Sequence, residues 1–325
     1  MGLGAVLGPE APLIMLGSGV AVWVLRLFRP GAPPPVRSMV GAAGSFAAVS
    51  TLLGSPITGA FLLMEVSGIG GPMLGVVLVP GLLAAGIGSL VFIGLDTWTG
   101  LGTYSLALPH VPHAGAPTGA EFGWALAIGL AAALLETGIC RSALLLQPRV
   151  EQHRLPATVL TGSAVAGLAI AYAEGSGGSA TEVLYSGQSA LGPLLANSAD
   201  YTVGTVTLLL VCKGLAYCAS LSAFRGGPIF PAIFLGAAGG IALSHLPGLH
   251  LTPAFAMGVA GMSVAMLRLP LTSVLLATLL LGPQGLTVMP LVIVTVVASY
   301  VTTLMLVPAP PDSSRTGTRR TPTPR

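Results

Sequence analysis

Charged residues are scarce in this chain of 325 residues: Asp, Glu, Lys and Arg make up only 7% of it, against about 25% in an ordinary soluble domain. Aromatic residues are also few, at 6%, whereas 53% of the residues are hydrophobic and the mean hydropathy is +0.89. This balance excludes an ordinary soluble domain, and we expect the lipid bilayer rather than a nucleic acid as a partner. The composition predicts an integral membrane protein.

Cysteine is equally rare. Cys140, Cys212 and Cys218 all lie in apolar runs and form no Cys-x-x-Cys or Cys/His spacing, so we expect packing roles rather than a disulfide, a metal site or a cofactor. No nucleophile and base stand at a recognisable spacing, and no phosphate-binding loop is visible. We therefore expect that the protein is not an enzyme.

Glycine and proline, in contrast, are abundant, with 45 and 27 residues. Both are common in membrane helices, because neighbouring helices satisfy the backbone groups that these residues free. Apolar and polar residues do not alternate with the period of two that a membrane barrel needs. The prediction is an all-α, polytopic membrane protein.

One stretch occurs twice. Residues 7–17 (LGPEAPLIMLG) align without a gap on residues 226–236 (GGPIFPAIFLG), so that Pro9 falls on Pro228, 219 residues later. Each copy is a Gly/Pro turn that opens an apolar helix. A second pair follows in the same order, since Pro56-Ile57-Thr58 is echoed by Pro270-Leu271-Thr272. Two related halves are the internal symmetry expected of transporter folds.

The division of the chain follows from this repeat. We assign residues 1–95 to a partial first repeat, 96–121 to a polar linker, 122–307 to the second transmembrane repeat, and 308–325 to a tail that is disordered by composition. Apolar helices are expected over 11–28, 40–51, 73–95, 123–146, 156–173, 201–224, 228–246, 253–267 and 286–307, with shorter ones ending near 66, 195 and 281.

Several of these helices are too short or too broken to cross a bilayer. Irregular backbone at membrane depth is tolerated only inside a protein or beside a polar cavity, which indicates a transport pathway. A helix that begins there presents unpaired N–H groups and the positive end of its dipole. Each such end favours an anion by only ~0.3–1 kcal/mol at exposed sites, weak enough for the ion to leave again. The alternative is that these Gly and Pro residues only break packed helices.

An acid is present in the first copy alone, at Glu10. A carboxylate at the centre of a membrane helix costs about 2.5–3.5 kcal/mol, and a helix N-terminus offsets part of that. Glu10 would therefore act as a tethered anion that must swing away or bind a proton before a free anion enters, which is the behaviour of a gate. The alternative is a simple partner for the dipole of its own helix.

Gly8-Pro9-Glu10-Ala11-Pro12 and Gly226-Gly227-Pro228-Ile229-Phe230-Pro231 resemble the CLC family of voltage-gated chloride channels and chloride/proton antiporters. The resemblance implies two inverted helical repeats, a homodimer with one pore in each subunit, and chloride held at opposed helix N-termini. It also implies that Glu10 is the gating glutamate. The anion-binding positions would be Gly8, Pro9, Ala11, Gly226, Gly227, Ile229 and Phe230.

The chain departs from that family in several places. Pro9 replaces an arginine and Ala11 a glycine, which would alter the affinity or selectivity of the anion site. The family's first helices, with a Gly-Ser-Gly-x-Pro loop, would precede Met1, so the first repeat is expected to be incomplete. Tyr300 lies in what resembles the helix before the one that supplies a tyrosine to chloride.

Three further positions bear on the mechanism. The family's antiporters relay protons through a glutamate that follows another acid, and here the pair reads Glu65-Val66. Val66 favours a passive channel, while Glu65 is more simply a locally paired acid. Lys213 is expected either to raise the potential for anions or to pair with Glu136 or a carbonyl.

Arg225 would attract anions at a pore mouth or snorkel to the membrane interface. The leading interpretation is a multi-pass, homodimeric chloride channel of the plasma membrane, conducting passively and gated by Glu10. One alternative is a chloride/proton antiporter of the same fold, and another is a non-conducting membrane scaffold or truncated fragment.

Overall fold

The computed structural model describes residues 4–68, 72–100 and 105–306, and in these ranges the regular structure is helical apart from one isolated bridge between Gly8 and Gly227. Seven of the described helices are long and apolar enough to cross a membrane, which agrees with the predicted all-α polytopic class. The α-helices are α1 (Glu10–Phe28), α2 (Pro34–Leu53), α3 (Pro56–Ser67), α4 (Pro72–Thr99), α5 (Gly119–Gln152), α6 (Arg154–Ser176), α7 (Leu191–Ala196), α8 (Val203–Ala223), α9 (Ile229–Leu243), α10 (Leu251–Leu267), α11 (Pro270–Leu281) and α12 (Pro283–Leu306).

The predicted helix bounds differ most from the structure at two places. The helix expected from residue 40 begins at Pro34, because proline has no N–H to lose in the first turn of a helix and fits there without strain. The helix expected to stop at residue 146 continues through Pro148 to Gln152. Only His153 then separates α5 from α6.

The structure repeats four helices in order, α1–α4 and α9–α12. In the first set α1 packs on α2 at Gly17, where a Cβ atom would lie 2.5 Å from the carbonyl oxygen of Gly44. In the second, α9 packs on α10 at Gly236, where a Cβ would lie 2.2 Å from the carbonyl oxygen of Gly258. Helices α3 and α11 both have 12 residues and begin with proline, and α4 and α12 both contain an internal proline.

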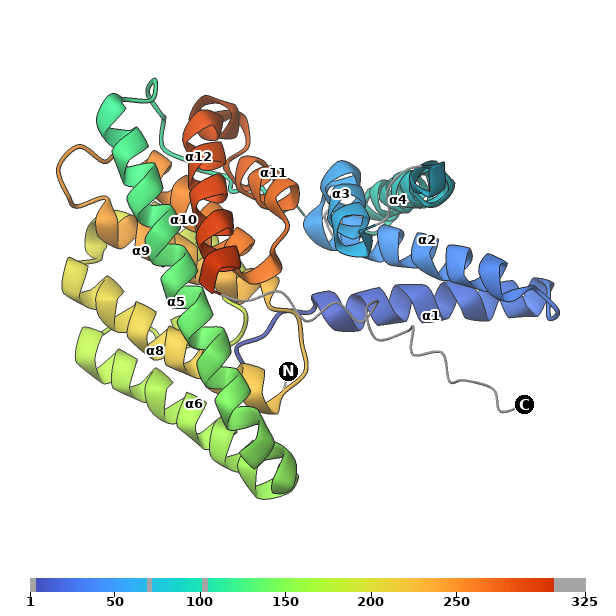
Figure 1. Ribbon diagram of the computed structural model, residues 1–325, viewed down its shortest axis with the longest axis horizontal. Coiled ribbons are helices and arrows are strands. Elements are labelled where there is room, and N and C mark those ends of the chain that lie inside the picture. The colour runs from blue at the N-terminus through green and yellow to red at the C-terminus, as the bar shows by residue number, and fades with distance from the viewer. Residues whose placement is uncertain (1–3, 69–71, 101–104, 307–325) are drawn as a thin grey trace, which may run out of the picture.

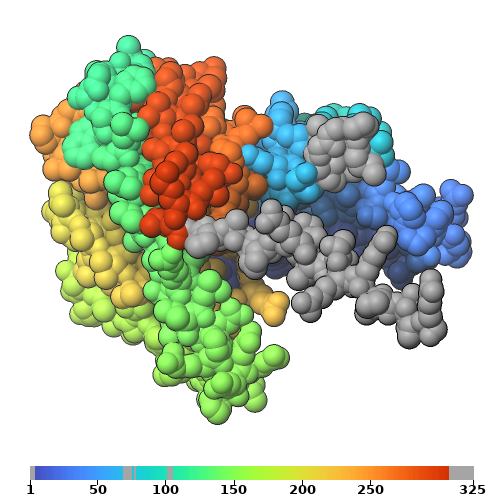
Figure 2. Space-filling view, in the orientation of Figure 1, coloured from blue at the N-terminus to red at the C-terminus, as the bar shows by residue number. Residues whose placement is uncertain are grey.

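The two sets differ in their surroundings. Helices α1–α4 form a block to one side of the molecule, while α5–α12 form a larger body (Figures 1 and 2). Helices α9 and α10 lie at the centre of that body, since nearly every side chain on them is buried. The outer helices expose large apolar side chains such as Trp23 and Trp98, as expected of surfaces that face lipid.

The segment interpreted as a linker is packed against the second repeat where the structure describes it. Leu106 and Ala114 are buried, and the N–H of Leu108 donates to the carbonyl oxygen of Leu280 at 2.9 Å. The N–H of Ala114 donates to the side chain of Gln284 at 3.0 Å. Residues 105–118 therefore form a fixed strap along α11 and α12.

Candidate functional site

The two copies of the Gly/Pro turn lie side by side. The N–H of Gly8 donates to the carbonyl oxygen of Gly227 at 2.6 Å, and the N–H of Gly227 donates to that of Gly8 at 2.8 Å. This antiparallel bridge joins residues 219 positions apart in the sequence. The N-termini of α1 and α9, which begin at Glu10 and Ile229, are consequently held next to each other.

The carboxylate of Glu10 reaches across to the other helix. Only 3% of Glu10 is exposed, and its Oε1 accepts a hydrogen bond from the N–H of Phe230 at 3.1 Å. Phe230 is the second residue of α9, so its N–H is one of the four that a helix leaves unpaired at its start. Oε2 has no hydrogen-bond partner among the described residues. An acid from α1 therefore occupies the positive end of α9.

Glycine at positions 8 and 227 makes room for this carboxylate. A Cβ atom at Gly227 would lie 1.6 Å from Oε2 of Glu10, and one at Gly8 would lie 2.0 Å from the same oxygen. Any larger residue would have to push the carboxylate out. The two glycines and the N–H of Phe230 thus define a small seat for one negatively charged group, which we call the α9 seat.

The other predicted anion-binding residues surround this seat at different depths. Ile229 is buried at the start of α9, and Gly226 packs closely on Leu7, whose Cβ would lie 2.7 Å from a Cβ at position 226. Pro9 is half-buried, whereas Ala11 is exposed on α1. The structure brings Gly8, Glu10, Gly227 and Phe230 together, and the roles assigned to them stay predictions.

Helix α8 (Val203–Ala223) supports both turns, which the sequence did not reveal. The hydroxyl of Tyr217 donates to the carbonyl oxygen of Pro228 at 3.2 Å, and Oγ of Ser220 accepts from the N–H of Val6 at 3.0 Å. Both side chains are fully buried. Positions three apart share a helix face, so two polar residues at this spacing in an apolar run are the signal that could have identified them.

Lys213 lies one turn before Tyr217 and is fully buried. Its Nζ donates to the carbonyl oxygens of Glu182 at 2.6 Å and Val183 at 3.2 Å, with those of Leu184 and Tyr185 at 3.4 Å. The same atom lies 4.2 Å above the ring of Phe234 on α9. Of the two structural pairings considered for Lys213, the structure shows the carbonyls and not Glu136.

Arg225 is exposed immediately before the second turn. It lines a polar pocket of about 420 Å³ together with Arg154, Glu151 and Gln147 from the α5–α6 junction. This pocket is a suitable location for the predicted attraction of anions by Arg225 at a pore mouth, because Arg225 is two residues before Gly227.

The Glu65-Val66 pair lies at the end of α3, away from the α9 seat. The carboxylate of Glu65 accepts hydrogen bonds from the N–H groups of Leu271 at 3.0 Å and Thr272 at 2.8 Å, and from the Thr272 hydroxyl at 2.6 Å. Glu65 thus caps the start of α11; the acid is paired, as the simpler expectation had it, but with a helix 206 residues away and not locally.

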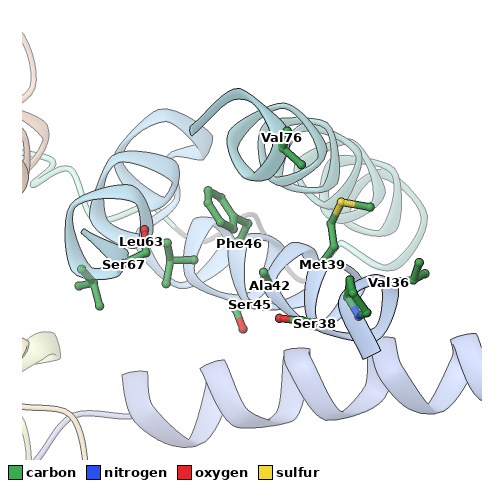
Figure 3. A pocket seen from close by; sticks show the side chains of 11 residues that line it. Val36, Ser38, Met39, Ala42, Ser45, Phe46, Leu63, Ser67 and Val76 are labelled. Carbon is green, nitrogen blue, oxygen red and sulfur yellow. The ribbon is translucent and has the colours of Figure 1, made fainter. Parts of the chain in front are cut away.

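Val66 is 60% exposed and lines a pocket of about 550 Å³ between α2, α3 and α4 (Figure 3). The side chains drawn there, among them Met39, Phe46 and Leu63, include none that ionises. The residue at the expected relay position is therefore apolar, and none of the side chains that line its pocket ionises.

Comparison with known proteins gives a consistent result. The family model described as voltage gated chloride channel matches residues 1–303. The chain is similar in structure to a CLC-type fluoride/proton antiporter, with a TM-score of 0.66 and 21% identity over 91% of this chain and 70% of that one. It is also similar to a slow cyanobacterial Cl⁻/H⁺ antiporter, with a TM-score of 0.72 and 17% identity over 94% of this chain and 70% of that one. No curated protein matches the chain significantly.

Proposed function

The chain belongs to the voltage-gated chloride channel (CLC) family, and from that membership we propose that it carries chloride or a similar small anion through the α9 seat, with Glu10 as the gate. The observation that carries the proposal is the position of the Glu10 carboxylate, which accepts the Phe230 N–H between Gly8 and Gly227. A negatively charged oxygen already occupies the place that a free anion would take.

The gate works by competition. A carboxylate accepts a charge-assisted hydrogen bond from a helix N–H, whereas a protonated carboxyl group is neutral and binds the positive helix end far less. When Glu10 binds a proton or rotates away, the Phe230 N–H and the start of α9 become available to an anion. Since each contact is weak, the anion leaves again and transport continues.

Passive conduction is the first form of this function. In the family's antiporters a second glutamate relays protons, whereas Val66 stands at that position here, and none of the side chains that line its pocket ionises. With no acid there, the Glu10 gate would open by exchanging protons with the outside solution, and anions would flow down their gradient.

The test is anion efflux from liposomes that contain the purified full chain. We expect the efflux of wild-type protein to rise as the external pH falls, and efflux through the Glu10→Gln variant to be higher and nearly independent of pH. The Glu174→Gln variant, which neutralises an exposed acid on α6, is the control and should respond to pH as the wild type does. An unchanged pH response in Glu10→Gln contradicts the gate, and wild-type protein that releases no anion supports the non-conducting scaffold.

Proton-coupled exchange is the second candidate. Two observations favour it: the similar structures are described as fluoride/proton and chloride/proton antiporters, and the body of this chain holds a buried acid near the middle of α5, Glu136, which is 1% exposed. A chloride gradient that drives protons uphill across the liposome membrane identifies an exchanger, whereas anion flux without proton movement identifies a channel.

Family membership also supports a homodimer in which each subunit has its own α9 seat. The mass of the purified protein in detergent, corrected for bound detergent, should be twice that of one chain. In dimers that combine one wild-type and one Glu10→Gln subunit, we expect a flux midway between those of the two parent dimers. A monomeric mass contradicts this part of the proposal.

A further inference from the structure

Another acid is buried in a membrane-spanning helix and is not part of the α9 seat. Glu136 is near the midpoint of α5 (Gly119–Gln152) and is 1% exposed. At 1.5 Å per residue it is about 25 Å from either end of that helix. An intramembrane carboxylate costs about 2.5–3.5 kcal/mol even on lenient scales, so a purely packing role would be filled better by an apolar residue.

The immediate contacts of Glu136 do not neutralise it. Its Oε1 accepts a weak hydrogen bond from the thiol of Cys140 at 3.4 Å, one turn further along the helix. Its Oε2 and the adjacent Thr137 hydroxyl oxygen have no hydrogen-bond partner among the described residues. A buried carboxylate without a counter-charge is costly, and binding a proton removes that cost.

The cations on the helices packed against α5 are occupied elsewhere or lie at helix ends. Lys213 on α8 binds the carbonyls of residues 182–185, and Arg141 on α5 itself binds the carbonyl oxygen of Leu306. Helices α9 and α10 contain no titratable residue within their bounds, and Arg268 caps α10. The remaining titratable or charged groups of these helices are Arg154, Tyr172 and Glu174 on α6, Cys212, Tyr217 and Cys218 on α8, Tyr300 on α12, and Glu121, Arg149 and Glu151 on α5.

Tyr217 is on α8, the helix that packs against both α9 and α5, which carries Glu136. Its side chain is fully buried, and its hydroxyl donates to the carbonyl oxygen of Pro228 in the turn that forms the α9 seat. A phenolic hydroxyl both donates and accepts. Tyr217 is thus a buried proton-exchanging group on the helix that contacts both α5 and the α9 seat.

The other side of Glu136 leads toward the surface. Cys140 is half-buried, and its Sγ lies 3.6 Å from Sδ of Met266, two residues before Arg268, which is exposed between α10 and α11. The start of α11 is also where Glu65 binds. Glu136 is therefore linked through Cys140 to the α10–α11 junction, where Glu65, the neighbour of Val66, binds.

We propose that Glu136 is the internal proton-binding group of this transporter and replaces the acid that is missing at Val66. The proposal rests on the proposed function in its proton-coupled form. Glu136 releases its carboxyl proton and becomes a carboxylate, the Tyr217 hydroxyl accepts a proton on one side while releasing its own on the other, and Glu10 accepts it and becomes neutral. Neutral Glu10 leaves the Phe230 N–H, an anion binds there, and Glu136 regains a proton from the solution beyond Cys140.

The experiment measures anion efflux and proton movement in the same proteoliposomes, with a chloride gradient as the only driving force. For Glu136→Gln we expect proton movement to fall by about 10²-fold, the usual contribution of a positioned proton-transfer group, while chloride efflux continues. Glu174→Gln removes an exposed acid and should keep both fluxes.

Each outcome separates the two proposals. Wild-type chloride efflux without proton movement overturns the role of Glu136 and leaves the Glu10 gate intact, whereas the lack of wild-type chloride efflux overturns the proposed function itself. Coupled proton movement that survives in Glu136→Gln also overturns the role of Glu136.

A second measurement applies should Glu136→Gln fail to fold. In infrared spectra of the wild-type protein in lipid, we expect a carbonyl band of a buried protonated carboxyl group that changes during chloride-driven turnover, and Glu136→Asp should shift that band. A band that Glu136→Asp leaves unmoved overturns the proposal.

Discussion

Helices α1 and α9 begin with the same turn but differ in what surrounds them. In α1 the only buried residue is Glu10, whereas 12 of the 15 residues of α9 are buried. Both helices nevertheless pack on the next long helix through a glycine at the same place, Gly17 or Gly236. The shared sequence therefore sets the backbone and the helix pairing, and the position in the molecule sets which copy becomes the interior.

The difference also decides which copy supplies charge and which receives it. Helices α9 and α11 have no acid in their first turns, and each is completed by an acid from the first repeat, Glu10 on α9 and Glu65 on α11. A buried helix start without its own acid is open to an external anion. Acids of the first repeat thus bind the helix N-termini of the second repeat that have no acid of their own.

The most severe way to break this relation is to fill the α9 seat. We expect Gly227→Ala to lower chloride efflux by about 10²-fold, the usual cost of displacing a bound group by about 1 Å, because the new Cβ would lie 1.6 Å from the position of the Glu10 oxygen. The control is Gly239→Ala on the same helix, where a Cβ would meet nothing within 4 Å.

A double variant tests whether the α9 seat holds a free anion or only the Glu10 carboxylate. If a free anion takes the place of the carboxylate, the double variant Glu10→Ala with Gly227→Ala should stay as slow as Gly227→Ala. Recovery of efflux in the double variant would show that the anion binds elsewhere.

Next in size is the packing of each copy on its neighbour. We expect Gly236→Ala to destabilise the fold by about 1–3 kcal/mol, as overpacking usually does, because its Cβ would lie 2.2 Å from a carbonyl oxygen inside the body. Gly17→Ala meets a carbonyl oxygen at 2.5 Å, but the exposed α1–α4 block has more freedom to move apart, so the loss should be smaller. Thermal unfolding in detergent measures both, and an equal loss would contradict the inner-versus-outer distinction.

The repeat made much of this site predictable. The alignment of Gly8 with Gly227 predicted two similar helix starts, because a gapless duplication fixes local backbone geometry, and the resemblance to the family implied that the two starts and the Glu10 carboxylate meet. The chain order of the helices followed from apolar runs broken by Gly and Pro. These are properties of neighbouring residues, which the sequence contains directly.

What escaped prediction depends on contacts between distant residues. Glu65 was expected to pair locally, and it is indeed a structural cap, but its partner helix starts about 200 residues later. Tyr217 and Ser220 looked like ordinary members of an apolar helix, although they hold the two turns. The strap over residues 105–118 was interpreted as a linker because its prolines and polar residues show nothing of the surface on which it packs.

A smaller effect is expected at the second tethered acid. Glu65→Gln keeps the shape of the side chain, but its NH₂ group cannot accept a hydrogen bond, so one of the two hydrogen bonds from the α11 N–H groups is lost and the other becomes neutral. The change should cost about 0.5–2 kcal/mol, as loss of a helix cap usually does. The melting temperature should fall, while chloride efflux per folded protein and its pH response should stay as in the wild type. A changed pH response would show that Glu65 also acts in transport, as we propose for Glu10.

The smallest effect is expected just before each turn, where the copies differ in charge. The aligned residues are Val6 and Arg225. Val6 is buried, with its N–H bound to Ser220, whereas Arg225 is exposed in the polar pocket near the inner copy.

An exposed cation raises the local anion concentration only over about one Debye length, which is roughly 8 Å at physiological ionic strength. Arg225→Gln should therefore slow chloride efflux by about twofold to fivefold in dilute buffer and leave it unchanged at high salt. Arg149→Gln, another exposed arginine whose guanidinium binds a carbonyl of its own helix, is the matched control. An equal loss at high and low salt would assign Arg225 to anchoring the end of α8 at the membrane interface, and the charge difference between the copies would then have no part in transport.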